Sequence, residues 1–150
     1  MSVGLRVCVM FTVGLVLAGC GGGYTPEQGV TVNGTIVKGG QPLQVPRRDV
    51  GLGSVEVQLV PTGPAAAGMG LETALVAEDG SFELRGAGRG IPPGKYKVAV
   101  YQHDQGPGSD ALNGVFSDAK TPIEVEIPED KIGSTHDLGV IDLDAYAQKK

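Results

Sequence analysis

The chain has 150 residues, including 25 Gly and 10 Pro, so it is long enough for one domain and too rich in helix-breaking residues for long helices. Aromatic residues make up 5% of it and Trp is absent, which leaves Val, Ile, Leu and Ala to build the core. A formal net charge of -5 without a basic cluster argues against a protein that binds nucleic acid.

Residues 1–19 have the features of a secretory signal peptide. Arg6 is the only charge in this segment, and an apolar stretch over residues 7–17 follows it. That stretch is shorter than the roughly 20 apolar residues that a membrane-spanning helix requires. It ends in two small residues directly before Cys20, so the sequence predicts cleavage on the N-terminal side of that Cys.

The tetrapeptide Leu17-Ala18-Gly19-Cys20 resembles the lipobox of bacterial lipoproteins. The resemblance implies that Cys20 becomes the first mature residue and carries a diacylglyceryl thioether, usually together with a further acyl chain such as palmitate. Each buried methylene contributes roughly 0.8 kcal/mol and one chain alone binds only marginally, so two or three chains would hold the protein at a membrane. An ordinary secreted protein cleaved nearby and an uncleaved N-terminal anchor are the alternatives.

The neighbours of Cys20 extend this interpretation. Gly21, rather than Asp, follows the acylated Cys, which by resemblance to known lipoproteins favours the outer membrane or the cell surface over the inner membrane. Residues 20–29 are rich in Gly and predict a flexible tether. Cys8 lies in the segment that would be removed, so the mature chain would have no internal disulfide and would depend on core packing.

From residue 30 onward, apolar and polar residues alternate in short runs between turn signals. The predicted strands span residues 30–37, 54–60, 71–77, 81–84, 95–101, 121–127 and 137–143. This pattern predicts an all-β domain over residues 30–144, built as a seven-stranded antiparallel β-sandwich. The turn at Asp79-Gly80 is expected to close a hairpin between two of these strands, and residues 145–150 are expected to fray.

Two connections between the predicted strands are long, residues 38–53 and 102–116. Long loops on a rigid sheet scaffold commonly carry binding sites. Tyr101 lies directly before the second loop, which holds His103 and Asp104. Because sugar sites generally use exposed aromatic side chains, Tyr101, His103 and Asp104 are the candidate ligand-binding residues.

Several motifs follow one another along this domain. They are Val32-Asn33-Gly34-Thr35-Ile36 before Gly40-Gln41-Pro42-Leu43, then Glu56-Val57-Gln58-Leu59-Val60-Pro61, Glu78-Asp79-Gly80-Ser81-Phe82 and residues 90–98. In this order they resemble the carboxypeptidase regulatory-like, transthyretin-like domains. The resemblance covers residues 30–143 and implies a transthyretin-like or Ig-like sandwich, but no particular chemistry. The loop at residues 44–53 departs from the family pattern.

A catalytic or metal site needs convergent side chains, and the sequence offers few. His103 and His136 are the only histidines, and neither a His-Glu-x-x-His nor a Gly-x-Ser-x-Gly motif occurs. We therefore expect a protein that is not an enzyme and holds no metal or cofactor. Two carboxylate pairs leave a weak calcium site open: Asp104 with Asp110, and Asp142 with Asp144.

These observations lead to three functional hypotheses. The first is a non-enzymatic, membrane-anchored envelope lipoprotein whose domain is a structural or protein-interaction module. The alternative is a carbohydrate-binding module of the envelope. The expected partners are the membrane, through the lipid anchor, an envelope protein and, for the alternative, a glycan. A hydrolase is a third hypothesis, and it would depend on His103.

Overall fold

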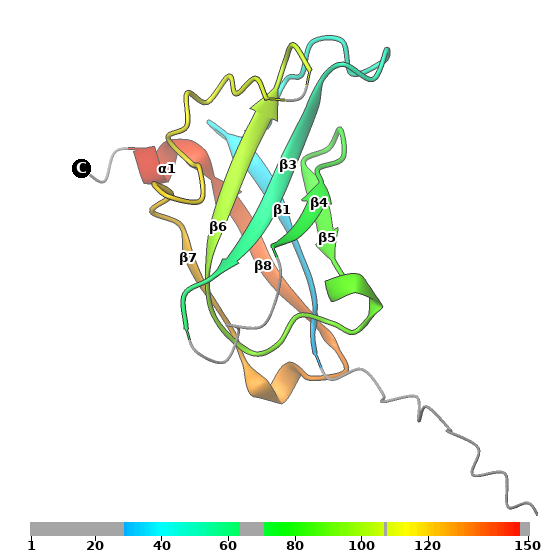
Figure 1. Ribbon diagram of the computed structural model, residues 1–150, viewed down its shortest axis with the longest axis vertical. Coiled ribbons are helices and arrows are strands. Elements are labelled where there is room, and N and C mark those ends of the chain that lie inside the picture. The colour runs from blue at the N-terminus through cyan, green and yellow to red at the C-terminus, as the bar shows by residue number, and fades with distance from the viewer. Residues whose placement is uncertain (1–28, 64–70, 107, 148–150) are drawn as a thin grey trace, which may run out of the picture.

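The computed structural model describes residues 29–63, 71–106 and 108–147 (Figure 1). The predicted signal peptide, Cys20 and the tether as far as residue 28 lie outside these residues. The elements in chain order are β1 (Thr31–Lys38), β2 (Gln41–Pro42), β3 (Ser54–Pro61), β4 (Glu72–Leu75), β5 (Ser81–Leu84), η2 (Gly86–Gly88), β6 (Gly94–His103), β7 (Glu124–Ile127), η3 (Glu129–Lys131), β8 (Thr135–Asp142) and α1 (Leu143–Ala147). The domain is mostly β-sheet with very little helix, which confirms the all-β prediction.

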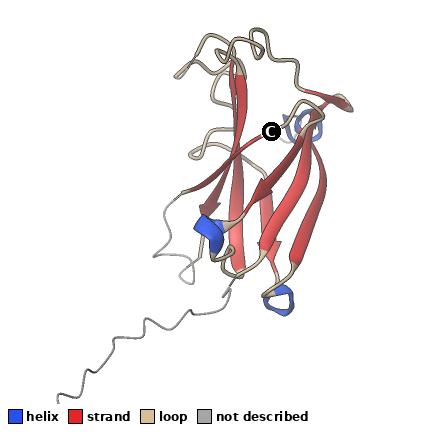
Figure 2. Cartoon of the chain, turned by 90° about the vertical axis from the view of Figure 1, so that its right-hand side faces the viewer, coloured by secondary structure: helices blue, strands red, loops and turns tan. Residues whose placement is uncertain are grey.

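The strands form two sheets that face each other across a common core (Figures 1 and 2). One sheet has the order β4-β3-β6-β7, and its neighbouring strands are all antiparallel. In the other sheet β1 is central, with β8 along one edge and with β5 and β2 in succession along the opposite edge. Because β8 runs parallel to β1, this second sheet is mixed.

The strand pairing differs from the sequence prediction. Each predicted run contains a strand, but β2 adds an eighth, and β8 is parallel rather than antiparallel to its neighbour. The turn at Asp79-Gly80 forms, yet β4 pairs with β3 and β5 pairs with β1, so the predicted hairpin is wrong. The turn instead carries the chain from one sheet to the other. This crossing lets Val76 and Phe82, on either side of the turn, both enter the core.

The core is formed by the inward-facing residues of the alternating strands, as the sequence pattern predicts. The buried side chains of the longer strands are Val32, Ile36, Val55, Val57, Leu59, Phe82, Leu84, Tyr96, Val98 and Val100. Glu124 and Glu126 on β7 point outward and are exposed. Ile123 and Ile127, which flank them, are buried. The period of two therefore determines the two faces of both sheets.

The C-terminal segment begins with a short helix that the sequence analysis did not predict. Residues 145–150 were expected to fray, whereas α1 extends through Ala147 and residues 148–150 lie outside the described part. Leu143 at the start of α1 is fully buried, and Tyr146 packs against the core. The helix is held by this apolar contact rather than by its length, because five residues are too few for a stable isolated helix.

The two long loops lie at the same end of the sheets (Figures 1 and 2). β1 starts next to Gly29 at one end, and β6 runs in the same direction before it enters the second loop. We call the end near Gly29 the proximal end and the end with the loops after β2 and β6 the distal end. Among the described residues, no helix is both long and apolar enough to cross a bilayer.

Candidate functional site

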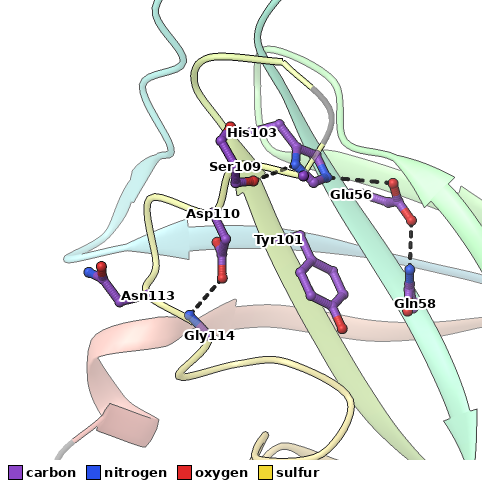
Figure 3. Close-up of a pocket in the computed structure, with 9 residues that line it drawn as sticks. Glu56, Gln58, Tyr101, His103, Ser109, Asp110, Asn113 and Gly114 are labelled. Carbon is purple, nitrogen blue, oxygen red and sulfur yellow. Dashed lines mark hydrogen bonds and ion pairs between the residues drawn. The ribbon is translucent and has the colours of Figure 1, made fainter.

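Outward-facing side chains of β3 and β6 and the loop after β6 line an open hollow at the distal end, which we call the distal hollow (Figure 3). Since β6 buries Val98 and Val100, its alternation turns Tyr101 and His103 to the outer face. The hollow has a volume of ≈ 440 Å³. Its lining residues are Glu56, Gln58, Tyr101, His103, Gly108, Ser109, Asp110, Asn113 and Gly114.

Tyr101 forms part of the wall of the hollow, between β3 and the loop (Figure 3). It lies directly opposite Glu56 in the β3–β6 register. Its ring is parallel to the imidazole of His103, with the ring centroids 6.3 Å apart and an interplanar angle of 5°. The Tyr101 hydroxyl accepts a hydrogen bond from the Asp118 N–H at 3.1 Å and lies 3.3 Å from its Oδ1. These contacts fix the orientation of the ring.

His103 links β6 to the loop and to β3. Its Nδ1 lies 2.6 Å from the Ser109 carbonyl oxygen, and its Nε2 lies 3.8 Å from Oε2 of Glu56. Because a carbonyl oxygen only accepts hydrogen bonds, Nδ1 carries a proton in this arrangement. Oε1 of Glu56 accepts a hydrogen bond from Nε2 of Gln58 at 2.7 Å. Polar groups from three segments therefore meet around the hollow.

Asp110 organises the loop that closes one side of the hollow. Its Oδ1 accepts hydrogen bonds from the N–H groups of Gln102 at 3.2 Å and Leu112 at 3.0 Å. Its Oδ2 accepts from the N–H of Gly114 at 2.7 Å. Leu112 and, further along, Phe116 are buried in the core. The carboxylate of Asp110 is thus occupied by backbone donors, and apolar anchors hold the rest of the loop.

The structure brings together only part of the predicted site. Tyr101 and His103 line the distal hollow, whereas Asp104 is not among the described residues that line it. Glu56 and Gln58 were not predicted as site residues, although the sequence placed both at outward positions of a strand. They lie beside Tyr101 and His103 because of the register between β3 and β6, and that register is known only once the strand pairing is known.

Of the second pair of carboxylates considered for calcium, Asp142 and Asp144, the first binds backbone donors. Asp142 accepts hydrogen bonds from the N–H groups of Gly39 and Gly40, each at 3.0 Å, and from that of Asp144 at 3.1 Å. The Asp144 contact first, and then the two glycine contacts, lower the pKa of Asp142 below its ordinary value. In the described part of the chain, no group of three or more His, Cys, Asp and Glu side chains is arranged to hold a metal ion.

The loop after β2 is held by two side-chain contacts, one near its start and one near its middle. The Gln102 side-chain amide donates to the Gln44 carbonyl oxygen at 2.9 Å, and the Arg48 guanidinium donates to that of Val76 at 2.9 Å. The tip presents Val50 and Leu52, which are 63% and 46% exposed. The distal end therefore offers a polar hollow and, beside it, a loop that exposes Val50 and Leu52 together with the charged Arg47 and Asp49.

Comparisons with known proteins add no family. No protein-family model, curated protein or solved structure was found to match the chain. The imidazole of His103 contacts the main-chain carbonyl of Ser109, whose hydroxyl instead donates to the Gly106 carbonyl oxygen at 2.8 Å. These three residues thus do not form the hydroxyl-to-imidazole contact that activates a serine nucleophile.

Proposed function

We propose that this chain is a lipid-anchored protein of the bacterial envelope whose β domain is a non-enzymatic structural or protein-interaction module. The lipobox-like residues 17–20 and the tether that follows support the anchor. The motifs over residues 30–143 support a variant of the transthyretin-like sandwich, with a parallel edge strand added by β8. The outer membrane or the cell surface is the proposed location.

The observation that carries this proposal is the arrangement of the two ends of the domain. Gly29, which leads back toward Cys20, lies at the proximal end, and both long loops lie at the distal end (Figure 1). β6 has ten residues, and at about 3.3 Å per residue it separates the two ends by about 30 Å. In a domain anchored through Cys20, the loops would therefore be the part farthest from the point at which the tether joins the domain.

The loop tip supports protein interaction as the role of this end. The loop is held near its start by the contact of Gln44 with Gln102, and near its middle by Arg48. A loop that is already ordered loses little conformational entropy on binding, so its exposed side chains can contribute more of their contact energy to affinity. Val50 and Leu52 are such side chains. They lie at the end farthest from the tether, where a partner would meet the domain.

The anchor is tested by labelling cells with a palmitate analogue. Wild-type protein should incorporate the label, and Cys20→Ser should abolish incorporation. Cys8→Ser is the matched control, because this residue lies in the segment that the proposal removes. Labelling that persists in Cys20→Ser, or that depends on Cys8, would rule out the proposed anchor.

The interaction surface is tested by photo-cross-linking in intact envelopes. A cross-linking amino acid at position 52 should give a defined adduct with an envelope protein. The same amino acid at position 140 is the control, because Val140 on β8 is 71% exposed but belongs to the face of a sheet rather than to the distal loops. Equal adducts at both positions, or none at position 52, would contradict the assignment of the interaction to this loop.

A second candidate, carbohydrate binding, is favoured by the distal hollow. The hollow is lined by the Tyr101 ring, which suits the C–H face of a sugar, and by the polar groups of Glu56 and Gln58, which suit its hydroxyl groups. A glycan array of the soluble 24–150 fragment tests this candidate. Binding should be lost in Tyr101→Ala and retained in Asp104→Ala, which alters a residue outside the hollow. Absence of signal on every sugar argues for the first function.

A further inference from the structure

The chain contains two Asn-Gly dipeptides in contrasting environments, Asn33-Gly34 and Asn113-Gly114. In such a dipeptide the backbone nitrogen of Gly can attack the side-chain amide of Asn, because Gly offers no side chain to hinder the approach. The reaction requires the backbone to leave most regular conformations, so a fixed ladder suppresses it and a mobile turn permits it.

The first dipeptide is held inside a sheet. Asn33 on β1 pairs with Glu83 of β5 on one side and with Asp137 of β8 on the other. Gly34 lies beneath the ring of Phe82, where even an added Cβ would come 2.9 Å from Cζ. Neither residue can rotate without breaking the central strand of the sheet, so this dipeptide is protected by the fold.

The second dipeptide lies in a turn at the rim of the distal hollow (Figure 3). Asn113 is exposed and has a left-handed φ of 56°. Within the described part of the chain, its side-chain nitrogen forms one hydrogen bond, to the Ala111 carbonyl oxygen at 3.4 Å. One contact restrains the attacking group: the Gly114 N–H donates to Oδ2 of Asp110 at 2.7 Å. This is a charge-assisted hydrogen bond, and it must open before the nitrogen can react.

We propose that Asn113 is a site of spontaneous deamidation and that Asp110 slows the reaction. Hydroxide from the solvent removes the Gly114 amide proton, and the nitrogen attacks Cγ of Asn113. The new C–N bond closes a five-membered succinimide, and the side-chain nitrogen leaves as ammonia. Water then adds to either ring carbonyl, which gives Asp or isoaspartate at position 113. The net change is the exchange of an amide for a carboxyl group, with one water consumed and one ammonia released.

The product changes the distal hollow. The described lining residues include Glu56 and Asp110 but no Lys or Arg, so an Asp at position 113 adds a third carboxylate without a cation beside it. Isoaspartate also lengthens the main chain inside the turn that Asp110 holds. The modification therefore alters the charge of the hollow and loosens one of its walls as the protein ages.

The first test compares the two sites within one molecule. Purified full-length protein in detergent is incubated at mildly alkaline pH, digested, and the peptides that contain Asn33 and Asn113 are analysed by mass spectrometry. In the folded protein, conversion should accumulate at Asn113 and not at Asn33. In urea both sites should react at similar rates, because the dipeptide is the same. Folded protein that reacts equally at both sites, or first at Asn33, would overturn the proposal.

The second test concerns Asp110. Asp110→Ala removes the acceptor of the Gly114 N–H, together with the contacts to Gln102 and Leu112. It should speed conversion at Asn113 by about 10- to 150-fold, the range that corresponds to one charge-assisted hydrogen bond. Asp104→Ala removes a carboxylate from the same loop without touching the turn and should leave the rate unchanged. If Asp110→Ala unfolds the domain, Asn33 also reacts and reports the unfolding. An Asp110→Ala variant that stays folded and reacts at the wild-type rate would show that Asp110 does not restrain the site.

Discussion

Tyr96 ties the start of β6 to the segment that enters it, and its hydroxyl can be removed without disturbing the core. The side chain is 1% exposed, and its hydroxyl donates to the Pro92 carbonyl oxygen at 2.7 Å. Tyr96→Phe keeps the ring and deletes this donor. A hydrogen bond contributes about 0.5–1.5 kcal/mol net, and the acceptor is only partly buried, so we expect the free energy of unfolding to fall by about 1 kcal/mol.

The ring itself should matter more than the hydroxyl. Tyr96→Ala leaves a cavity in the core and should lower the free energy of unfolding by about 3–5 kcal/mol, as for other large aromatic side chains. Urea unfolding followed by circular dichroism measures both variants. A Tyr96→Phe variant as stable as the wild type would show that the Pro92 contact contributes nothing. A loss equal to that of Tyr96→Ala would show that ring burial is not the larger effect, and either outcome refutes the reasoning.

The same residue predicts the response to alkaline pH. Burial first, and the carboxylate of Glu72 second, raise the pKa of Tyr96 above its ordinary value of 10.0. A phenol whose folded pKa exceeds its unfolded pKa contributes stability that is fully present below the unfolded pKa. That contribution is lost as the pH rises from about 10 through the folded pKa. The urea midpoint of Tyr96→Phe should therefore fall less above pH 10 than that of the wild type.

Three further predictions concern the scaffold. Backbone donors at the start of α1 and in the β1–β2 turn hold the pKa of Asp142 below 3.8, so its stabilising contribution is present above about pH 4 and lost below it. An acid titration of Asp142→Asn should therefore show lower stability at neutral pH and a smaller acid-induced loss. Gly90→Ala should lower the free energy of unfolding by more than about 2 kcal/mol, since its φ is +78° and a Cβ would overlap the Gly29 backbone. Gly88→Ala, with a φ of +82° in open space, should lower it by about 1 kcal/mol. Urea unfolding measures both variants. Thr121→Val should lower the free energy of unfolding by about 1–3 kcal/mol in the same assay, because the buried Thr121 hydroxyl donates to the Val98 carbonyl oxygen of β6 at 2.6 Å.

The sequence predicted the strands better than their partners. Alternation reports which residues of a strand face the core, and each predicted run contains a strand of the structure. It does not report pairing. The turn at Asp79-Gly80 has hairpin chemistry, but the Val76 N–H donates to the Val55 carbonyl oxygen and the Ile36 N–H to that of Gly80, so opposite sides of the turn join different sheets. Local turn preference was outweighed by these long-range ladders.

The parallel pairing of β8 with β1 could not be predicted from the sequence for a related reason. Thr31 lies opposite Thr135, at the other end of the domain sequence. A parallel neighbour needs a long connection, and nothing in the alternation distinguishes it from an antiparallel one. β8 also accommodates a register shift opposite Gly34, where Gly139 has a φ of +71°. A bulge of this kind adjusts the register after pairing, so it could not be predicted before the partner was known.

The distal hollow depends on both kinds of information. Tyr101 and His103 could be found from the sequence because they end a clearly alternating strand beside a polar loop. Glu56 joins them only because β3 and β6 pair in one register, and a shift of one residue would turn it into the core. The pairing that buries Val57 opposite Val100 thus also places Glu56 opposite Tyr101. The packing of the core and the composition of the hollow are therefore consequences of the same register, and a variant that shifts one must disturb the other.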